Sequence, residues 1–319
     1  RGLKSRGPCQ YRNLCSRGCP FAGYFSSNSA TLPAARATGN LTLQPFAVVH
    51  SIIYDDHKQK ATGVRVIDAQ TGKATEYFSK IIFINAGTLN TTLLLLNSVS
   101  SRFPSGFGND NGILGHYLMD HNYRGHINAE YDGFYDQYYY GRRPTGVYIP
   151  RYRNVGKDSQ SKYVRGFAFA AEASRRTGQP GDLTIGAGYK EALTEPGVWD
   201  IWMNGMGECL PYYENSVSLS PDKKDQWGIP LLEIDCEYKK NELTMLDDIL
   251  ESGAEMVEKA GFRNIEAYDS EQAPGQGIHE MGTARMGRDP GTSILNAQNQ
   301  VWGAKNVFIT DGACMTSNA

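Results

Sequence analysis

Residues 80–98 constrain the fold of this 319-residue chain more than any other segment. A short apolar run, KIIFIN, ends in Ala-Gly and is followed by TLNTTLLLLNS, in which Thr88 or Asn90 is placed to cap a helix. A continuous apolar run is typical of a strand buried in a parallel sheet. A strand, a tight glycine turn and a helix recur at the edge of nucleotide-binding sheets. The segment therefore predicts part of an α/β nucleotide-binding sheet.

Segments on both sides of it predict antiparallel strands. Residues 41–55 alternate or run apolar, and residues 61–79 have the pattern of a hairpin that turns at AQTGKA. Between about 113 and 272, several short strands are separated by turn residues. Within that region, residues 241–262 place apolar side chains at helical spacing up to Gly261. The pattern predicts an antiparallel sheet with a helix on one face, and so a chain that is α/β in one part and α+β in the other.

Charge and hydropathy argue against two classes of main partner. The formal net charge is −2, with acidic and basic residues mixed, so nothing indicates nucleic acid or an anionic membrane surface. No apolar run approaches the roughly 18 residues that span a bilayer. The length allows two domains and a large core.

The segment from His279 to Thr316 carries a resemblance to a known family. Its residues HEMGTARMG, then DP, N and VWGAKNVFITDGACMT, closely resemble the C-terminal signature of the glucose–methanol–choline (GMC) flavoprotein oxidoreductases. Residues 40–98 are similar to the family's later FAD-domain strands, and ILGHYLMDH, residues 113–121, is similar to its loop between domains. In detail, the sequence of these segments is most similar to that of the large catalytic subunit of bacterial sugar dehydrogenases, such as glucoside 3-dehydrogenase.

The resemblance implies a partial Rossmann-like FAD-binding domain with an inserted antiparallel-sheet substrate domain. Residues 1–112 would be part of the FAD-binding domain with a cysteine-rich loop, 113–272 the substrate domain, and 273–319 the return to the FAD-binding domain with the histidine loop. The family's G-x-G-x-x-G fingerprint would precede Arg1, since the glycines in GNDNGILG and GQGIHEMG follow no clear strand. We therefore expect the sequence to be a piece of a longer protein, cut at both ends.

The resemblance also implies which residues hold FAD. They are Val49, Ala86, Gly87, Asp311, Gly312 and Ala313. The last three are expected against the ribityl chain and pyrophosphate, where backbone N–H groups can donate to phosphate oxygens. Val49 is expected to bracket the adenine through its backbone, and the Ala-Gly pair to pass close to the nucleotide half. From the residues alone, Val49 is equally an ordinary strand residue and Asp311 can be a turn former.

His279 is the candidate catalytic base. Oxidising an alcohol requires a hydride acceptor, which no side chain provides, and a proton acceptor, which near neutral pH is most simply a histidine. The resemblance places this histidine at His279, facing the flavin, with glycines around it that let the backbone pass close to the ring system. Taken alone, His279 is more simply a hydrogen-bonded buried histidine.

The remaining histidines show no pair at metal-ligand spacing on a clear helix, and His116 and His121 are expected to be structural. The family usually pairs its catalytic histidine with a second His or Asn. Counted from Asp311 and Gly312, that residue is expected about three positions past Ala319, out of register with Asn318.

Three cysteines, Cys9, Cys15 and Cys19, lie close together in CQYRNLCSRGCP. A proline after the last cysteine is typical of iron–sulfur ligand loops. The resemblance implies a 3Fe-4S cluster that passes electrons from the flavin toward a haem subunit, although relatives often have adjacent cysteines where Pro8 precedes Cys9. A disulfide plus a free thiol, or a structural zinc lacking an obvious fourth ligand, remain open alternatives.

The sequence thus predicts an FAD-dependent dehydrogenase that oxidises a sugar hydroxyl, with hydride passing to the flavin and the proton to His279. The implied partners are a small subunit and a haem-containing electron-acceptor subunit, and the implied location is periplasmic. One alternative is an oxygen-using sugar or alcohol oxidase, which the cysteine cluster argues against. Another is a non-catalytic carbohydrate-binding protein that stacks sugars on the tyrosine-rich residues 135–152.

Overall fold

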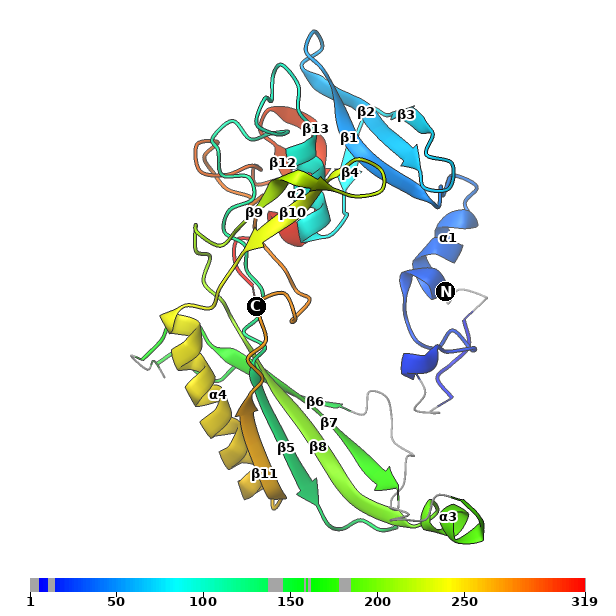
Figure 1. The fold of residues 1–319 in the computed structure, drawn as a ribbon, viewed down its shortest axis with the longest axis vertical. Helices are drawn as coiled ribbons and strands as arrows, with labels where there is room; N and C mark the ends of the chain where they lie inside the picture. Colours follow the sequence, from blue (N-terminus) through cyan, green and yellow to red (C-terminus); the bar gives the residue numbers. More distant parts are fainter. Residues whose placement is uncertain are drawn as a thin grey trace.

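The computed structural model describes residues 6–10, 15–136, 146–157, 159, 162–177 and 185–318. Figure 1 shows an upper part built around helix α2, a lower sheet flanked by helix α4, and an N-terminal segment along one side. Within the described ranges, no helix is both long and apolar enough to cross a membrane.

The upper part contains the predicted parallel strand pair. β4 (Ile82–Ile84) runs parallel to β13 (Ala304–Ile309), with β12 (Gln300–Val301) antiparallel on the far side of β13. Helix α2 (Thr88–Asn97) follows β4 directly. The predicted strand, glycine turn and helix are therefore confirmed.

The expected cap residue of α2 was wrong. The N-cap position is Gly87, which has a φ of 85° and provides no side-chain cap, and Thr88 is already the first helical residue. Glycine suits this turn because L-residues with a side chain rarely adopt that region of φ.

The predicted hairpin beside this unit is also confirmed. β1 (Ala47–Asp55), β2 (Lys60–Asp68) and β3 (Ala74–Phe78) form an antiparallel meander. In the β2–β3 turn, the carboxylate of Asp68 accepts hydrogen bonds from the backbone N–H groups of Gln70 and Thr71, at 2.9 and 2.8 Å.

The lower part is a five-stranded antiparallel sheet in the order β11-β5-β8-β7-β6. Its strands are β5 (Gly125–Tyr131), β6 (Gly146–Ile149), β7 (Phe167–Thr177), β8 (Pro196–Gly207) and β11 (Arg263–Asp269). Helix α4 (Lys240–Lys259) packs on one face of the sheet (Figure 1). The chain leaves α4 through Gly261, whose φ is 85°, so the predicted sheet, helix and C-terminal glycine are all found.

Glycines allow α4 to lie close to the sheet. A Cβ added to Gly125 of β5 or to Gly205 of β8 would clash with the Ile249 side chain of the helix. Ile249 and Met245 are fully buried in this contact. The sheet and the helix therefore share one hydrophobic core.

A second hairpin lies apart from this sheet. β9 (Ser216–Lys224) and β10 (Pro230–Asp235) pair with each other and contact α2 in the upper part. The predicted boundaries 1–112, 113–272 and 273–319 stay a prediction, but this hairpin of the middle segment lies with the upper part (Figure 1).

The remaining elements are short. They are the turns η1 (Cys15–Arg17), η2 (Ser27–Thr31) and η3 (Gly312–Cys314), and the helices α1 (Leu32–Arg36) and α3 (Ala187–Ala192).

Candidate active site

Asp311 joins the two turns that follow the parallel strands. Its Oδ2 accepts hydrogen bonds from the backbone N–H of Gly87 at 3.0 Å and from the Thr91 hydroxyl at 2.5 Å. Its Oδ1 accepts one from the backbone N–H of Ala313 at 3.0 Å, which caps η3. The carboxylate thus holds the turn after β4 against the turn after β13.

Five of the six residues predicted to hold FAD lie at this edge. Ala86 and Gly87 are exposed, Asp311 and Gly312 are half-buried, and Ala313 is buried. The carboxyl ends of parallel strands are where open α/β sheets bind ligands, and the N-terminus of α2 favours negative charge. The backbone N–H groups of Ala86 and Gly87 already donate to Thr91 Oγ1 and Asp311 Oδ2. The turn therefore offers a dinucleotide an exposed surface rather than free donors, and its role in holding FAD stays a prediction.

Val49 does not join these five residues. It lies on β1, opposite Val66, and the residue is 42% exposed. The carbonyl of the next residue, His50, accepts a hydrogen bond from Asn97, the last residue of α2. Val49 is therefore at the opposite end of that helix from Gly87, roughly 15 Å away along its axis.

Backbone hydrogen bonds fix the loop after His279 to the turn after β13. Gly282 N–H donates to Gly312 O at 3.1 Å, and Ala284 N–H donates to Ala313 O at 3.1 Å. A Cβ on Gly312 would clash with the Glu280 carbonyl and the Thr88 hydroxyl, which are hydrogen-bonded to each other. Residues 85–88, 279–287 and 310–314 thus form one assembly, called here the turn unit.

Asp120 anchors the start of the His279 loop from the other side. Its Oδ2 accepts hydrogen bonds from the N–H groups of Gly275 and Gly277, both at 2.9 Å. Its Oδ1 accepts from the N–H groups of His279 at 3.1 Å and His121 at 2.8 Å. This carboxylate is only 3% exposed, so four backbone donors satisfy one buried charge.

His121 lies directly beside the candidate base. The rings of His121 and His279 meet edge to face, with centroids 5.0 Å apart. His279 is otherwise exposed, whereas His121 is buried. Burial, and after it the neighbouring His279, lower the pKa of His121, so His121 stays neutral at neutral pH.

The sequence analysis proposed His279 as the base but assigned no functional role to the two residues beside it. Asp120 carried no role in the prediction, and His121 was expected to be structural. A signal was present in the Asp-His pair that ends ILGHYLMDH, but its partner loop lies more than 150 positions further along the chain. Asn318 is engaged at both ends of its amide, donating to Asp120 O at 2.9 Å and accepting from Cys209 N–H at 3.0 Å.

The three clustered cysteines lie in the N-terminal segment, with Cys9 exposed and Cys15 and Cys19 half-buried. Residues 11–14 between the first two, and 137–145 of the tyrosine-rich stretch, lie outside the described residues. Within the described ranges, no group of three or more His, Cys, Asp or Glu side chains could hold a metal ion. The predicted iron–sulfur centre therefore has no support from the described residues.

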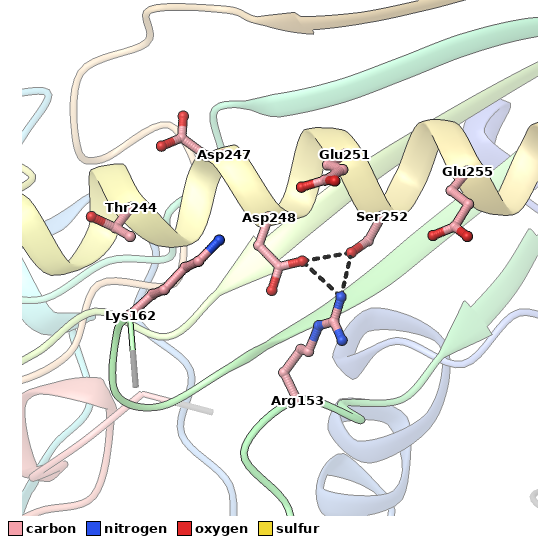
Figure 2. Close-up of a pocket in the computed structure, with 8 residues that line it drawn as sticks. All are labelled: Arg153, Lys162, Thr244, Asp247, Asp248, Glu251, Ser252 and Glu255. Carbon is pink, nitrogen blue, oxygen red and sulfur yellow. Dashed lines mark hydrogen bonds and ion pairs between the residues drawn. The ribbon is translucent and has the colours of Figure 1, made fainter. Parts of the chain in front are cut away.

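A cavity of about 290 Å³ opens beside α4, and no residue of the turn unit lines it (Figure 2). Its central carboxylate, Asp248, accepts hydrogen bonds from Arg153 at 2.9 Å, Ser252 at 2.6 Å and Tyr163 at 2.6 Å. These bonds tie α4 to the segment between β6 and β7. The cavity is thus explained by structural ion pairing and brings no group toward His279.

Two models of one family match the chain. Residues 4–123 match the N-terminal part and residues 211–319 the C-terminal part of "GMC oxidoreductase". Together they include the turn unit, Asp120 and His121.

Three curated proteins are similar over most of this chain. A 2-methyl-1,2-propanediol dehydrogenase of Mycolicibacterium austroafricanum is 29% identical over 81% of this chain and 47% of its own length. A gluconate 2-dehydrogenase flavoprotein of Pantoea cypripedii is 25% identical over 95% of this chain and 51% of its own length. A fructose dehydrogenase large subunit of Gluconobacter japonicus is 25% identical over 100% of this chain and 57% of its own length. The chain thus spans about half the length of these relatives.

A solved structure shows the same fold. Pyridoxine 4-oxidase from Mesorbium loti is similar with a TM-score of 0.56 and 18% identity, covering 91% of this chain and 57% of that one. At this identity the similarity speaks for the fold alone.

Proposed function

This chain belongs to the GMC oxidoreductase family, and from this premise we propose that it is part of an FAD-dependent dehydrogenase that oxidises a sugar hydroxyl to a carbonyl. One observation carries the proposal. Asp311 and the backbone bonds of the turn unit attach the loop of His279 to the strand ends where a dinucleotide is expected to bind. A proton acceptor and a cofactor edge are thereby held in one assembly.

His279 is the residue that takes the hydroxyl proton. Its backbone is held by Asp120 while its ring stays exposed, so an alcohol can approach the imidazole. FAD, when bound, supplies the hydride acceptor that no side chain provides. A neutral His121 against one edge places no positive charge beside His279 when it gains a proton.

The relatives support the substrate class and the cofactor. One is named for a sugar acid, gluconate, and is called a flavoprotein, and another is named for a sugar, fructose. Oxidation of a CH–OH group fits both names.

The electron acceptor is a separate part of the proposal. The names "dehydrogenase" and "large subunit" support electron transfer to a partner, such as a small subunit with a haem-containing one. The argument against an oxidase rested on an iron–sulfur cluster at the three cysteines, for which the described residues give no support. A periplasmic location stays a prediction.

The test uses the intact protein under anaerobic conditions. We expect a flavin absorption spectrum that bleaches when methyl α-glucoside is added, and fast recovery with ferricyanide but slow recovery with air. Fast recovery with air would make the protein an oxidase. A colourless protein that binds the sugar would contradict the enzyme and favour a carbohydrate-binding protein.

A further inference from the structure

One row of paired residues crosses the lower sheet on its far face, meaning the face turned away from α4. Across the five strands the pairs run Tyr268, His126, Asn204, Ala170 and Tyr148. Side chains alternate along each strand, and the neighbours of this row face α4. The row therefore lies opposite the hydrophobic core.

The centre of the row holds polar atoms without partners. Both ring nitrogens of His126 and the Nδ2 of Asn204 are buried, and none of them makes a hydrogen bond of ordinary geometry among the described residues, although the His126 ring lies close enough to the Tyr123 backbone to interact with it weakly. The two residues are 4% and 2% exposed. Leaving such groups unpaired costs free energy, so a polar partner at this point is favoured.

Aromatic rings frame these atoms. Trp202 and Tyr268 stack on His126 with centroids 5.7 and 5.5 Å away, and Tyr123 meets it edge-on at 5.4 Å. Aromatic walls with a few convergent polar groups are typical of small-molecule sites. Rings of this kind present flat apolar faces to the C–H side of a sugar.

Small side chains occupy the middle of the other half of the row. Ala170 and its neighbour on the same face, Ala168, are small and half-buried, and Tyr148 at the edge is 66% exposed. With strands about 4.8 Å apart, the floor between Asn204 and Tyr148 spans roughly 10 Å. The Nδ2 of Asn204 is itself buried, so a ligand over this floor reaches it only when a neighbouring side chain moves.

The row begins close to the candidate base. Asn122, the residue after His121, pairs with Gly207 at the end of β8. Asn204 lies three residues back along that strand, which is roughly 10 Å. His121 contacts His279, so a molecule over the row can extend to the base.

Charge narrows the class of ligand. The row itself contains no acidic or basic side chain other than His126, and burial lowers the pKa of that imidazole. A neutral imidazole offers one donor and one acceptor, and an amide NH₂ offers two donors. Hydroxyl groups, which both donate and accept, match this set better than a carboxylate does.

We propose that His126 and Asn204 bind ring hydroxyls of an uncharged sugar over the far face and position it for His279. This rests on the proposed function for the reaction that follows binding, but the binding itself does not depend on it. His126 and Asn204 are positioning residues, and the stacked rings give the subsite its shape.

The test compares Asn204→Leu and His126→Phe with Asn215→Leu in the intact, flavin-loaded protein. Asn215 is a buried Asn whose amide is satisfied at both ends, by Glu237 O and Glu237 N–H at 3.2 Å each. The probes are methyl α-glucoside and gluconate. Calorimetry gives the dissociation constant, anaerobic flavin bleaching gives the limiting rate, and thermal unfolding gives the midpoint.

We expect the first two variants to raise the dissociation constant for methyl α-glucoside by about 10-fold, as loss of one or two hydrogen bonds does. Their thermal midpoints should match or exceed wild type, since an apolar group replaces an unpaired one, whereas Asn215→Leu should melt lower. Gluconate should bind more weakly than the glucoside.

Three results would overturn the inference: unchanged glucoside affinity in both variants, a midpoint lowered as far as in Asn215→Leu, or tighter binding of gluconate. If wild type binds the glucoside and the variants do not, but no flavin bleaches, the subsite stands and the proposed function fails. If the flavin bleaches in all variants and all of them bind the glucoside with the wild-type affinity, the proposed function stands and the subsite fails.

Discussion

The turn unit and the far face of the lower sheet are built in different ways. The turn unit is made by backbone, since glycine turns, N–H donors and one carboxylate on each side fix its shape. The far face is made by side chains from five strands that a regular ladder brings into one row. A cofactor edge common to a family can be set by backbone geometry, whereas a substrate wall can change residue by residue.

The first prediction tests whether the chemistry belongs to the turn unit. His279→Ala should slow anaerobic flavin bleaching by saturating sugar by about 10²- to 10⁴-fold, because general-base catalysis contributes that much. The dissociation constant of the sugar should change little, since recognition lies on the far face. Stopped-flow absorbance on the intact protein measures both.

Asn204→Leu is expected to have the opposite pattern of effects on binding and rate from His279→Ala. It should weaken binding and leave the limiting rate nearly unchanged. If the flavin of His279→Ala bleached at a rate within a few-fold of wild type, the chemistry would not depend on the turn unit, and the base would have to be sought elsewhere.

The second prediction concerns Asp120, the anchor of the His279 loop. In Asp120→Asn an NH₂ group replaces one oxygen and faces backbone N–H donors, leaving two of the four bonds unmade. The free energy of unfolding should fall by about 3–6 kcal/mol, because each of the two lost bonds to a charged group is worth about 1.5–3 kcal/mol. Denaturant unfolding followed by tryptophan fluorescence measures this loss.

Asp68→Asn is its control, because Asp68 also accepts two backbone N–H bonds but in an exposed turn. It should lose much less stability. Equal losses in the two variants would show that Asp120 does not hold the loop in the way described.

The sequence was informative where contacts are local. Residues 80–98 predicted a parallel strand, a glycine turn and a helix, and these form β4 and α2. The spacing of apolar residues and Gly261 predicted α4 almost to its ends. Each of these features depends on neighbours a few positions apart.

The sequence was uninformative where contacts are distant. Asp120 meets its loop across about 155 positions, and the row through His126 joins five strands whose order follows from no local pattern. The cap of α2 was missed because glycine at φ 85° leaves no side-chain signal. The sequence did not indicate that β9 and β10 pair apart from the five-stranded sheet and contact α2, because a strand pattern does not say which sheet or helix it joins.

The third prediction tests whether the two faces of the lower sheet act independently. Gly205→Ala places a methyl group against Ile249 of α4 and should lower the free energy of unfolding by about 1–3 kcal/mol, as overpacking does. Sugar affinity should stay unchanged. In the double variant Gly205→Ala, Ile249→Ala the losses should be less than additive, because the second change makes room for the first. Additive losses would contradict the close packing.

The smallest predicted effect is a pH dependence of stability that comes from the far face. Burial lowers the pKa of His126, with the backbone at Tyr123 and then Asp269 opposing it more weakly. The unfolded chain therefore takes up a proton near pH 6.5 while the folded protein does not, so stability present above that pH falls as the pH drops from 7 to 5. His126→Phe should remove at most about 1 kcal/mol of that fall, whereas the non-titrating Asn204→Leu should leave the slope unchanged. Denaturant melts between pH 5 and 7 avoid the lower range in which carboxylates such as Asp269 titrate. A slope identical in His126→Phe and wild type would mean that the imidazole is not held neutral, and a charged His126 would reopen the row to anionic ligands.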